Sequence, residues 1–149
     1  MKGRIQMKKY LNFALGYAIA AMAGGVFYRE FTKMNGFTGV TVLGKVHTHF
    51  FLLGMTVFLI VALFAAHKDL RQIGAFRAFI CIYNSGVILT AVMMTVRGVF
   101  QVLGTTLSSG ASGAVSGIAG IGHILVGTGL VLLIVSLKKA SVSEEKTNE

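Results

Sequence analysis

Four long apolar stretches, separated by short polar segments, dominate the chain. They cover residues 10–28, 40–66, 76–103 and 114–137. At a rise of about 1.5 Å per residue, each stretch is long enough to cross about 30 Å of hydrocarbon. A backbone in lipid must satisfy its own hydrogen bonds, and the alternating pattern of a barrel strand is missing. The pattern therefore predicts one domain, residues 1–149, folded as an all-α integral membrane four-helix bundle.

The first apolar stretch also shares features with a signal peptide. It passes through a run of small residues at 18–23 and follows a cluster of positive charges, Lys2, Arg4, Lys8 and Lys9. The apolar residues continue through Phe27 and Tyr28, which is longer than a usual signal-peptide core. We therefore expect an uncleaved first span rather than a leader that is removed within residues 1–23.

Composition and charge placement exclude a soluble enzyme and predict an orientation. Hydrophobic residues make up 54% of the chain and charged residues 13%, too few to cover a water-facing surface. Most of the 14 lysines and arginines lie in the two tails and in the connection between the second and third stretches. This places both tails in the cytoplasm of a bacterial cell, with the protein in the inner (plasma) membrane. Basic residues are not interleaved with aromatic ones, so we expect no nucleic-acid partner.

Small residues recur at helical spacing and predict close helix contacts. Gly16, Ala20 and Gly24 share one face of the first span, and Gly113 and Gly117 form a GxxxG pair. Such faces let helices approach closely in lipid, and we expect them to support a homodimer. The Ser/Gly-rich residues 105–113 are predicted to be a flexible outer loop and residues 141–149 a flexible tail.

Five basic or histidine residues lie well inside the apolar stretches, where charge is costly and usually functional: Lys45, His47, His49, Arg97 and His123. Counted from the outer ends of their spans, both histidines of the second span lie about 10–13 Å deep, and His123 lies about 13 Å deep. Arg97 lies about 9 Å deep by the same rise. Three spans thus bring histidine or arginine to one layer.

Glycines share the helix faces of two of these histidines. His47 shares its face with Gly44 and Gly54, and His123 shares its face with Gly120 and Gly127. A flat macrocycle needs such clearance, and haem iron takes axial imidazoles from facing helices. The pattern predicts a haem b held by His123 and either His47 or His49. Arg97 would bind one propionate, because its planar guanidinium group can donate two hydrogen bonds to a carboxylate. Lys45 would bind the other propionate.

Two alternatives use the same residues. His47, His49 and His123, with Met55, Met93 or Met94, would suit copper, as in a metal-ion transporter or an accessory subunit. Buried polar groups can also join helices without any cofactor, as in a structural membrane subunit. No catalytic motif is present, and the five acidic residues lie outside the spans, which argues against an enzyme and against a proton-driven carrier.

The segment from Gly44 to Gly54, GKVHTHFFLLG, resembles the second helix of subunit I of nitric oxide reductases and other haem–copper oxidases. In that family a basic residue and a His-Thr-Asn stretch precede an apolar run. The resemblance implies that His47 is a ligand of a low-spin haem. His49 stands here in place of the asparagine, and Lys45 in place of an arginine.

Over most of its length the chain is similar to a family of small four-span bacterial membrane proteins of unknown function. The similarity lies in His47-Thr48-His49, Leu53-Gly54, Tyr83-Asn84, Arg97-Gly98 and Gly120-Ile121-Gly122-His123. It implies the four-span fold and no particular activity. The family lacks the further helices and copper ligands of an oxidase, so we do not expect oxygen reduction.

Overall fold

The protein forms four long helical spans. The computed structural model describes residues 2–148, with side chains described for residues 3–141. Its helices are α1 (Lys2–Met34), η1 (Val42–Lys45), α2 (Val46–His49), η2 (Phe50–Thr56), α3 (Val57–His67), η3 (Leu70–Gln72), α4 (Gly74–Val102) and α5 (Ser109–Asn148). Four stretches are long and apolar enough to cross a membrane: Gly3–Met34, Val42–His67, Gly74–Val102 and Ser109–Ser141. The predicted all-α membrane bundle is confirmed.

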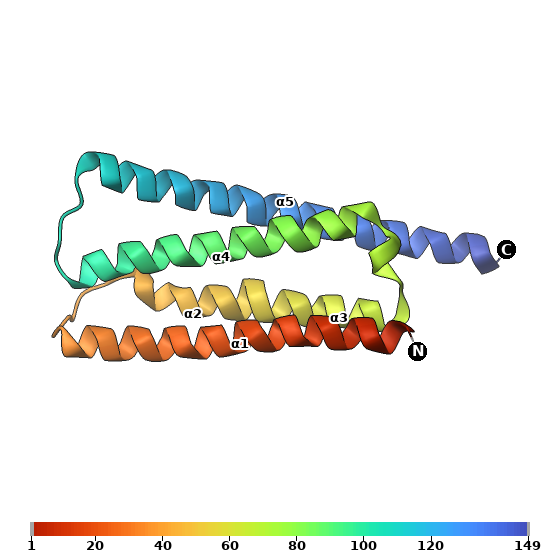
Figure 1. The fold of residues 1–149 in the computed structure, drawn as a ribbon, viewed down its shortest axis with the longest axis horizontal. Coiled ribbons are helices and arrows are strands. Elements are labelled where there is room, and N and C mark those ends of the chain that lie inside the picture. Colours follow the sequence, from red (N-terminus) through yellow and green to blue (C-terminus); the bar gives the residue numbers. More distant parts are fainter. Residues whose placement is uncertain (1, 149) are drawn as a thin grey trace.

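The spans lie side by side in chain order (Figure 1). α1 packs along the second span, which comprises η1, α2, η2 and α3, and this span packs against α4, which in turn packs along α5. Both termini and the connection from α3 to α4 lie at one end, called the termini end below. The connections at residues 35–41 and 103–108 lie at the opposite end, called the loop end. An even number of spans explains why the two tails share an end.

The turns at the loop end are built in the same way. Gly36 and Gly104 adopt positive φ angles of 59° and 65°, which glycine reaches without strain. In the first turn the amide of Gly36 donates to the carbonyl of Lys33, and that of Phe37 to Thr32. The same pair of bonds follows α4, so both helices end in a Schellman motif that satisfies their last carbonyls.

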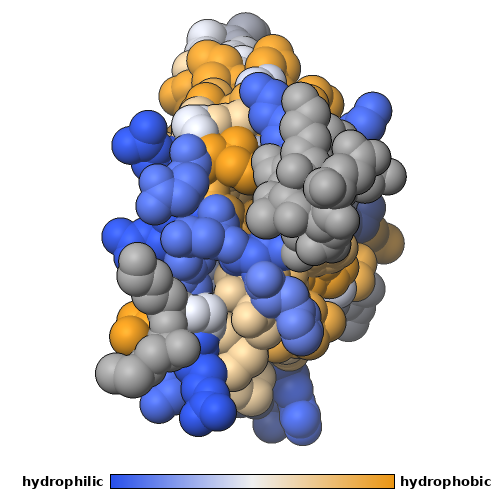
Figure 2. Space-filling model, turned by 90° about the vertical axis from the view of Figure 1, so that its right-hand side faces the viewer, coloured by the Kyte–Doolittle hydropathy of each residue, from blue (hydrophilic) through white to orange (hydrophobic). Residues whose placement is uncertain are grey.

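An aromatic core joins α1, α3 and α4 on the termini side of the histidines. Tyr17 stacks on Phe58 with ring centroids 5.7 Å apart, and Phe79 lies 5.2 Å from Tyr83. Apolar side chains such as Leu63 and Ile124 are instead about two-thirds exposed on the outer surface, where lipid would cover them. Hydrophilic side chains gather at the termini end (Figure 2). Shape and polar contacts, rather than exclusion of water, therefore hold the spans together.

The last helix extends beyond the apolar stretch at both of its ends. α5 begins at Ser109 instead of near residue 114, with Ser108 Oγ accepting a bond from the amide of Ala111. It also continues to Asn148, through the segment that was predicted to be a flexible tail. Adding a residue to an existing helix forms a backbone bond at little cost, and lysine and glutamate are good helix formers.

The second span is wound irregularly, although it contains no proline. It begins as a 3-10 turn, becomes α-helical at Val46–His49, and then forms a π-helix at Phe50–Thr56. The hydroxyl group of Thr56 bonds to the carbonyl of Phe51 over 3.0 Å, and Tyr83 of α4 donates to the carbonyl of Leu53 over 2.7 Å. Side chains thus satisfy carbonyls that the wider winding exposes.

Candidate functional site

The imidazole rings of His49 and His123 lie across from one another between α2 and α5. Their centroids are 6.4 Å apart, and the ring planes meet at 85°. His49 is half-buried, whereas His123 is exposed on the side of the isolated bundle. The structure therefore brings together imidazoles from the second and fourth spans at one level, as their depths in the sequence predicted.

Each ring of this pair is oriented by a bond to its own helix. Nδ1 of His49 lies 3.2 Å from the carbonyl oxygen of Lys45, and Nδ1 of His123 lies 2.8 Å from that of Ala119. A carbonyl oxygen only accepts, so each bond places the proton on Nδ1. In a neutral imidazole held in this way, Nε2 is the nitrogen with a free lone pair, and it is therefore the atom that could bind a metal.

His47 lies on another side of the second span, against α1. Its Cγ atom is 3.8 Å from the position that a Cβ atom would take on Gly25, and its Cβ atom is similarly close to Gly24. Its Nδ1 atom is buried and has no hydrogen-bond partner in the part of the chain that is described. The pair with His123 is thus formed by His49 and not by His47, the residue that the haem–copper oxidase resemblance implies as ligand.

Two cationic side chains lie on the loop-end side of the histidine pair. Arg97 of α4 donates a 2.5 Å hydrogen bond to Ser116 Oγ, two turns before His123 on the same face of α5. Lys45 is exposed, one turn before His49 on the second span. Within the described residues, neither Lys45 nor Arg97 forms an ion pair. Two cationic residues with no ion pair among the described residues therefore lie within two turns of the histidines on the loop-end side.

The predicted glycine clearance is present beside His123 and absent beside His47. No atom lies within 4 Å of where a Cβ atom would stand on Gly120 or Gly127. At Gly44 that space is filled by the Tyr28 ring, and at Gly54 by Tyr17. The interpretation of Gly44 and Gly54 as room for a macrocycle was therefore wrong, because these two glycines let α1 approach the second span.

The seven glycines between residues 110 and 129 also divide into two groups. A Cβ atom on Gly122 would meet Thr90, and one on Gly129 would meet Tyr83, so these two glycines allow α4 to approach α5 closely. The other five have open space around them: Gly110, Gly113, Gly117, Gly120 and Gly127. Packing within the chain therefore does not account for most of the glycines of α5.

The alternative of a site with three histidine ligands has no support in the structure. Among the described residues, no group of three or more histidine, cysteine, aspartate or glutamate side chains could hold a metal ion. His47 and His49 point to different sides of the second span, because residues two positions apart on a helix are separated by about 200° around its axis. Two imidazoles, not three, are available to one ligand.

Tyr83 and Asn84 both take part in hydrogen bonds between helices. Tyr17 of α1 donates to Asn84 Oδ1 over 2.6 Å, while Tyr83 reaches the π-helix of the second span. Sequence reasoning missed the π-helix itself, which begins at the residue after His49. π-Helical turns often mark functional sites, but hydrophobic periodicity carries no signal for one.

Comparison with known proteins places residues 7–140 in a family described as "Protein of unknown function (DUF2871)". The match covers most of the chain and confirms the expected small membrane family of unknown function. No curated protein and no solved structure matches the chain. The resemblance of the second span to haem–copper oxidases gains no support from these comparisons.

Proposed function

Since the chain belongs to the DUF2871 family, whose function is unknown, we propose from its own residues that it binds a haem b between His49 and His123. The observation that carries this proposal is the 6.4 Å separation of the two rings at 85°. His49 and His123 would hold the haem iron through their imidazoles, which come from two different spans and lie at one level. Perpendicular ring planes allow both imidazoles to meet a macrocycle edge-on.

The surroundings of the pair suit a macrocycle with two carboxylates. Gly120 and Gly127 leave open space on the face of α5 that carries His123. Arg97 and Lys45, which lack protein counter-ions in the described part of the chain, are the proposed partners of the propionates. A bound haem would supply a one-electron redox centre, for electron transfer, haem sensing or haem handling. The chain's own residues would set its position and orientation.

We propose that a second copy of the chain covers the exposed side of this site. His123 is exposed in the single chain, and Gly113 and Gly117 on the neighbouring turns of α5 have no packing partner within 4 Å. A face of small residues lets two membrane helices approach closely. Native mass spectrometry in detergent tests the homodimer, which Gly117→Leu should dissociate. A monomeric wild-type protein would contradict it.

The proposed location is the inner membrane of a bacterial cell, with the termini end in the cytoplasm. Ten of the 14 lysines and arginines precede residue 10, lie between residues 68 and 77, or follow residue 137. These segments belong to the termini end. Positive residues in short loops are retained on the cytoplasmic side. Labelling of cysteines introduced at each end of intact cells would check this orientation.

The haem proposal is tested by the absorption spectrum of detergent-purified protein produced with haem available. We expect the Soret band of a low-spin, bis-histidine haem in the wild-type protein. His49→Ala and His123→Ala should each abolish this spectrum. His47→Ala, which removes an imidazole at the same depth that faces α1, should retain it, and His67→Ala is a control outside the layer.

Other outcomes would contradict the proposal. A haem that survives His49→Ala but not His47→Ala would restore the ligand implied by the oxidase resemblance. A colourless protein that binds copper stoichiometrically would favour the metal-ion alternative. A protein that binds neither, and that unfolds more easily after His49→Ala, would leave the two histidines a structural role.

A further inference from the structure

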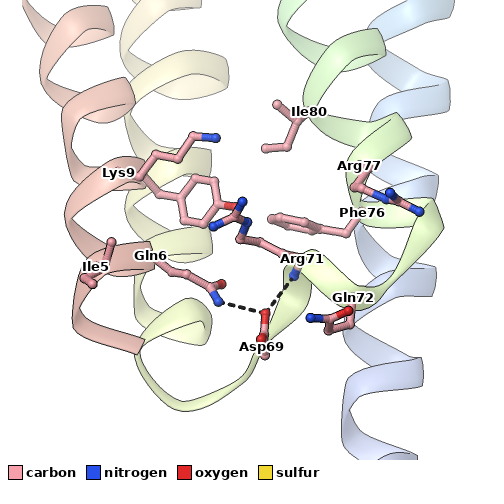
Figure 3. A pocket seen from close by; sticks show the side chains of 10 residues that line it. Ile5, Gln6, Lys9, Asp69, Arg71, Gln72, Phe76, Arg77 and Ile80 are labelled. Carbon is pink, nitrogen blue, oxygen red and sulfur yellow. Dashed lines mark hydrogen bonds between the residues drawn. The ribbon is translucent and has the colours of Figure 1, made fainter. Parts of the chain in front are cut away.

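A polar cavity of about 600 Å³ lies at the termini end, far from the histidine pair. Residues of α1, of η3 and of the first turns of α4 line it (Figure 3). Ile5, Phe76 and Ile80 give it apolar walls, with Ile80 on the side of the membrane interior, while Asp69 and Gln72 lie toward the end of the bundle. The cavity therefore lies where a membrane helix passes from hydrocarbon to headgroups.

Positive charge exceeds negative charge in this cavity. Among the described residues that line it, Lys9 of α1, Arg71 of η3 and Arg77 of α4 are cationic, and Asp69 carries the one carboxylate. Lys9 extends from α1 toward α4, and the guanidinium group of Arg71 lies between these two helices (Figure 3). Within the described residues, none of the three cations forms an ion pair. An anion can therefore gain contacts with several cationic side chains at once.

Asp69 accepts hydrogen bonds from two neighbouring groups, and one of these, the Gln6 side chain, keeps an oxygen atom without a donor among the described residues. Asp69 Oδ1 accepts a 2.7 Å bond from Gln6 Nε2 and a 3.3 Å bond from the amide of Arg71. Gln6 is only 6% exposed, and its Oε1 atom is buried without a hydrogen-bond partner in the described part of the chain. A buried acceptor without a partner is costly, so a ligand that brings a hydroxyl or amine donor would relieve it.

We propose that this cavity binds the phosphate group of an anionic phospholipid, with Lys9 and Arg71 on the phosphate oxygens and Gln6 Oε1 accepting from a headgroup hydroxyl. Arginine and lysine are the usual phosphate-binding residues. Basic pockets between membrane helices on the cytoplasmic side recognise phospholipid headgroups. The apolar walls would contact the start of the acyl chains. A free phosphate shares the anionic chemistry but has no acyl chain to contact these walls.

Native mass spectrometry of the full-length protein, released from nanodiscs of phosphatidylcholine with added phosphatidylglycerol, tests this site. We expect one phosphatidylglycerol to remain bound per chain after excess lipid is removed. The double substitution Lys9→Gln with Arg71→Gln should lower its affinity by about tenfold or more. The matched control is Arg4→Gln with Lys8→Gln, which removes the same charge from exposed residues of α1 outside the cavity. Circular dichroism would show that both variants remain helical.

A second experiment distinguishes binding of the lipid from binding of free phosphate, and it tests the role of Gln6 Oε1 as an acceptor. Delipidated protein is titrated with inorganic phosphate alone, and we expect binding far weaker than that of phosphatidylglycerol. Gln6→Leu should weaken phosphatidylglycerol more than the same lipid with its headgroup hydroxyls methylated. Equal lipid retention by the cavity and control variants, or equal binding of phosphatidylcholine, would overturn the proposal. Tight binding of inorganic phosphate would assign the site to a soluble anion instead.

Discussion

The Tyr17 hydroxyl group donates a 2.6 Å hydrogen bond to Oδ1 of Asn84, which joins α1 directly to α4. The Nδ2 atom of Asn84 donates in turn to the carbonyl of Ile80 over 2.6 Å. This bond fixes which amide atom faces Tyr17, because only the oxygen can accept. Since hydrophobic exclusion does not drive helix association in lipid, such directed bonds help to select one arrangement of the spans.

Removal of this hydroxyl group should weaken the bundle. We expect Tyr17→Phe to lower the free energy of unfolding by about 0.5–1.5 kcal/mol, because Asn84 Oδ1 loses its donor. Tyr28→Phe is the matched control, since the Tyr28 hydroxyl group forms no hydrogen bond with the described residues. Unfolding in mixed detergent and SDS micelles measures both. Equal effects of the two substitutions would show that the bond to Asn84 contributes nothing.

Two glycines should respond in opposite ways to alanine. A Cβ atom on Gly54 would collide with the Tyr17 ring, so we expect Gly54→Ala to cost about 1–3 kcal/mol through overpacking. Gly127 has open space around it, and alanine favours a helix over glycine by about 1 kcal/mol, so Gly127→Ala should be neutral or stabilising. Thermal unfolding of the haem-free protein in detergent compares them. A neutral Gly54→Ala would contradict the close contact of α1 with the second span.

The open face of α5 can be blocked without damage to the fold. We expect Gly120→Leu to abolish haem binding, because the new side chain would occupy the space next to His123. The unfolding temperature of the haem-free protein should remain within a few degrees, since no packed atom is displaced. Gly110→Leu introduces the same side chain at the start of α5, where space is also open, and should retain haem. Haem titration followed by absorbance reports on both variants.

The guanidinium group of Arg97 should affect haem binding through its charge. We expect Arg97→Gln to weaken haem binding by about tenfold, from the loss of one charge-assisted bond to a propionate. Esterification of both propionates should remove the difference between wild-type and variant proteins. Lys33→Gln removes a positive charge from the same end of the bundle and should leave the affinity unchanged. An effect of Arg97→Gln that persists with the dimethyl ester would place Arg97 outside the propionate site.

The sequence alone determined the four spans and the depth of their polar residues. Lipid imposes a minimum length and a helical backbone on any apolar stretch that crosses it, and residue counting then gives depth. The common level of His49 and His123, with Arg97 nearer the loop end, could therefore be predicted before any contact was known.

The tertiary structure decided which of two histidines faces His123. The helical repeat predicts that His47 and His49 point to different sides of the second span. Which of these sides faces α5 depends on how the span packs against its neighbours. Gly24 and Gly25 of α1 receive His47, and Tyr17 fills the space over Gly54, so the rotation of the second span is fixed by its contacts with α1. These contacts join residues more than 20 positions apart, and local periodicity carries no information about them.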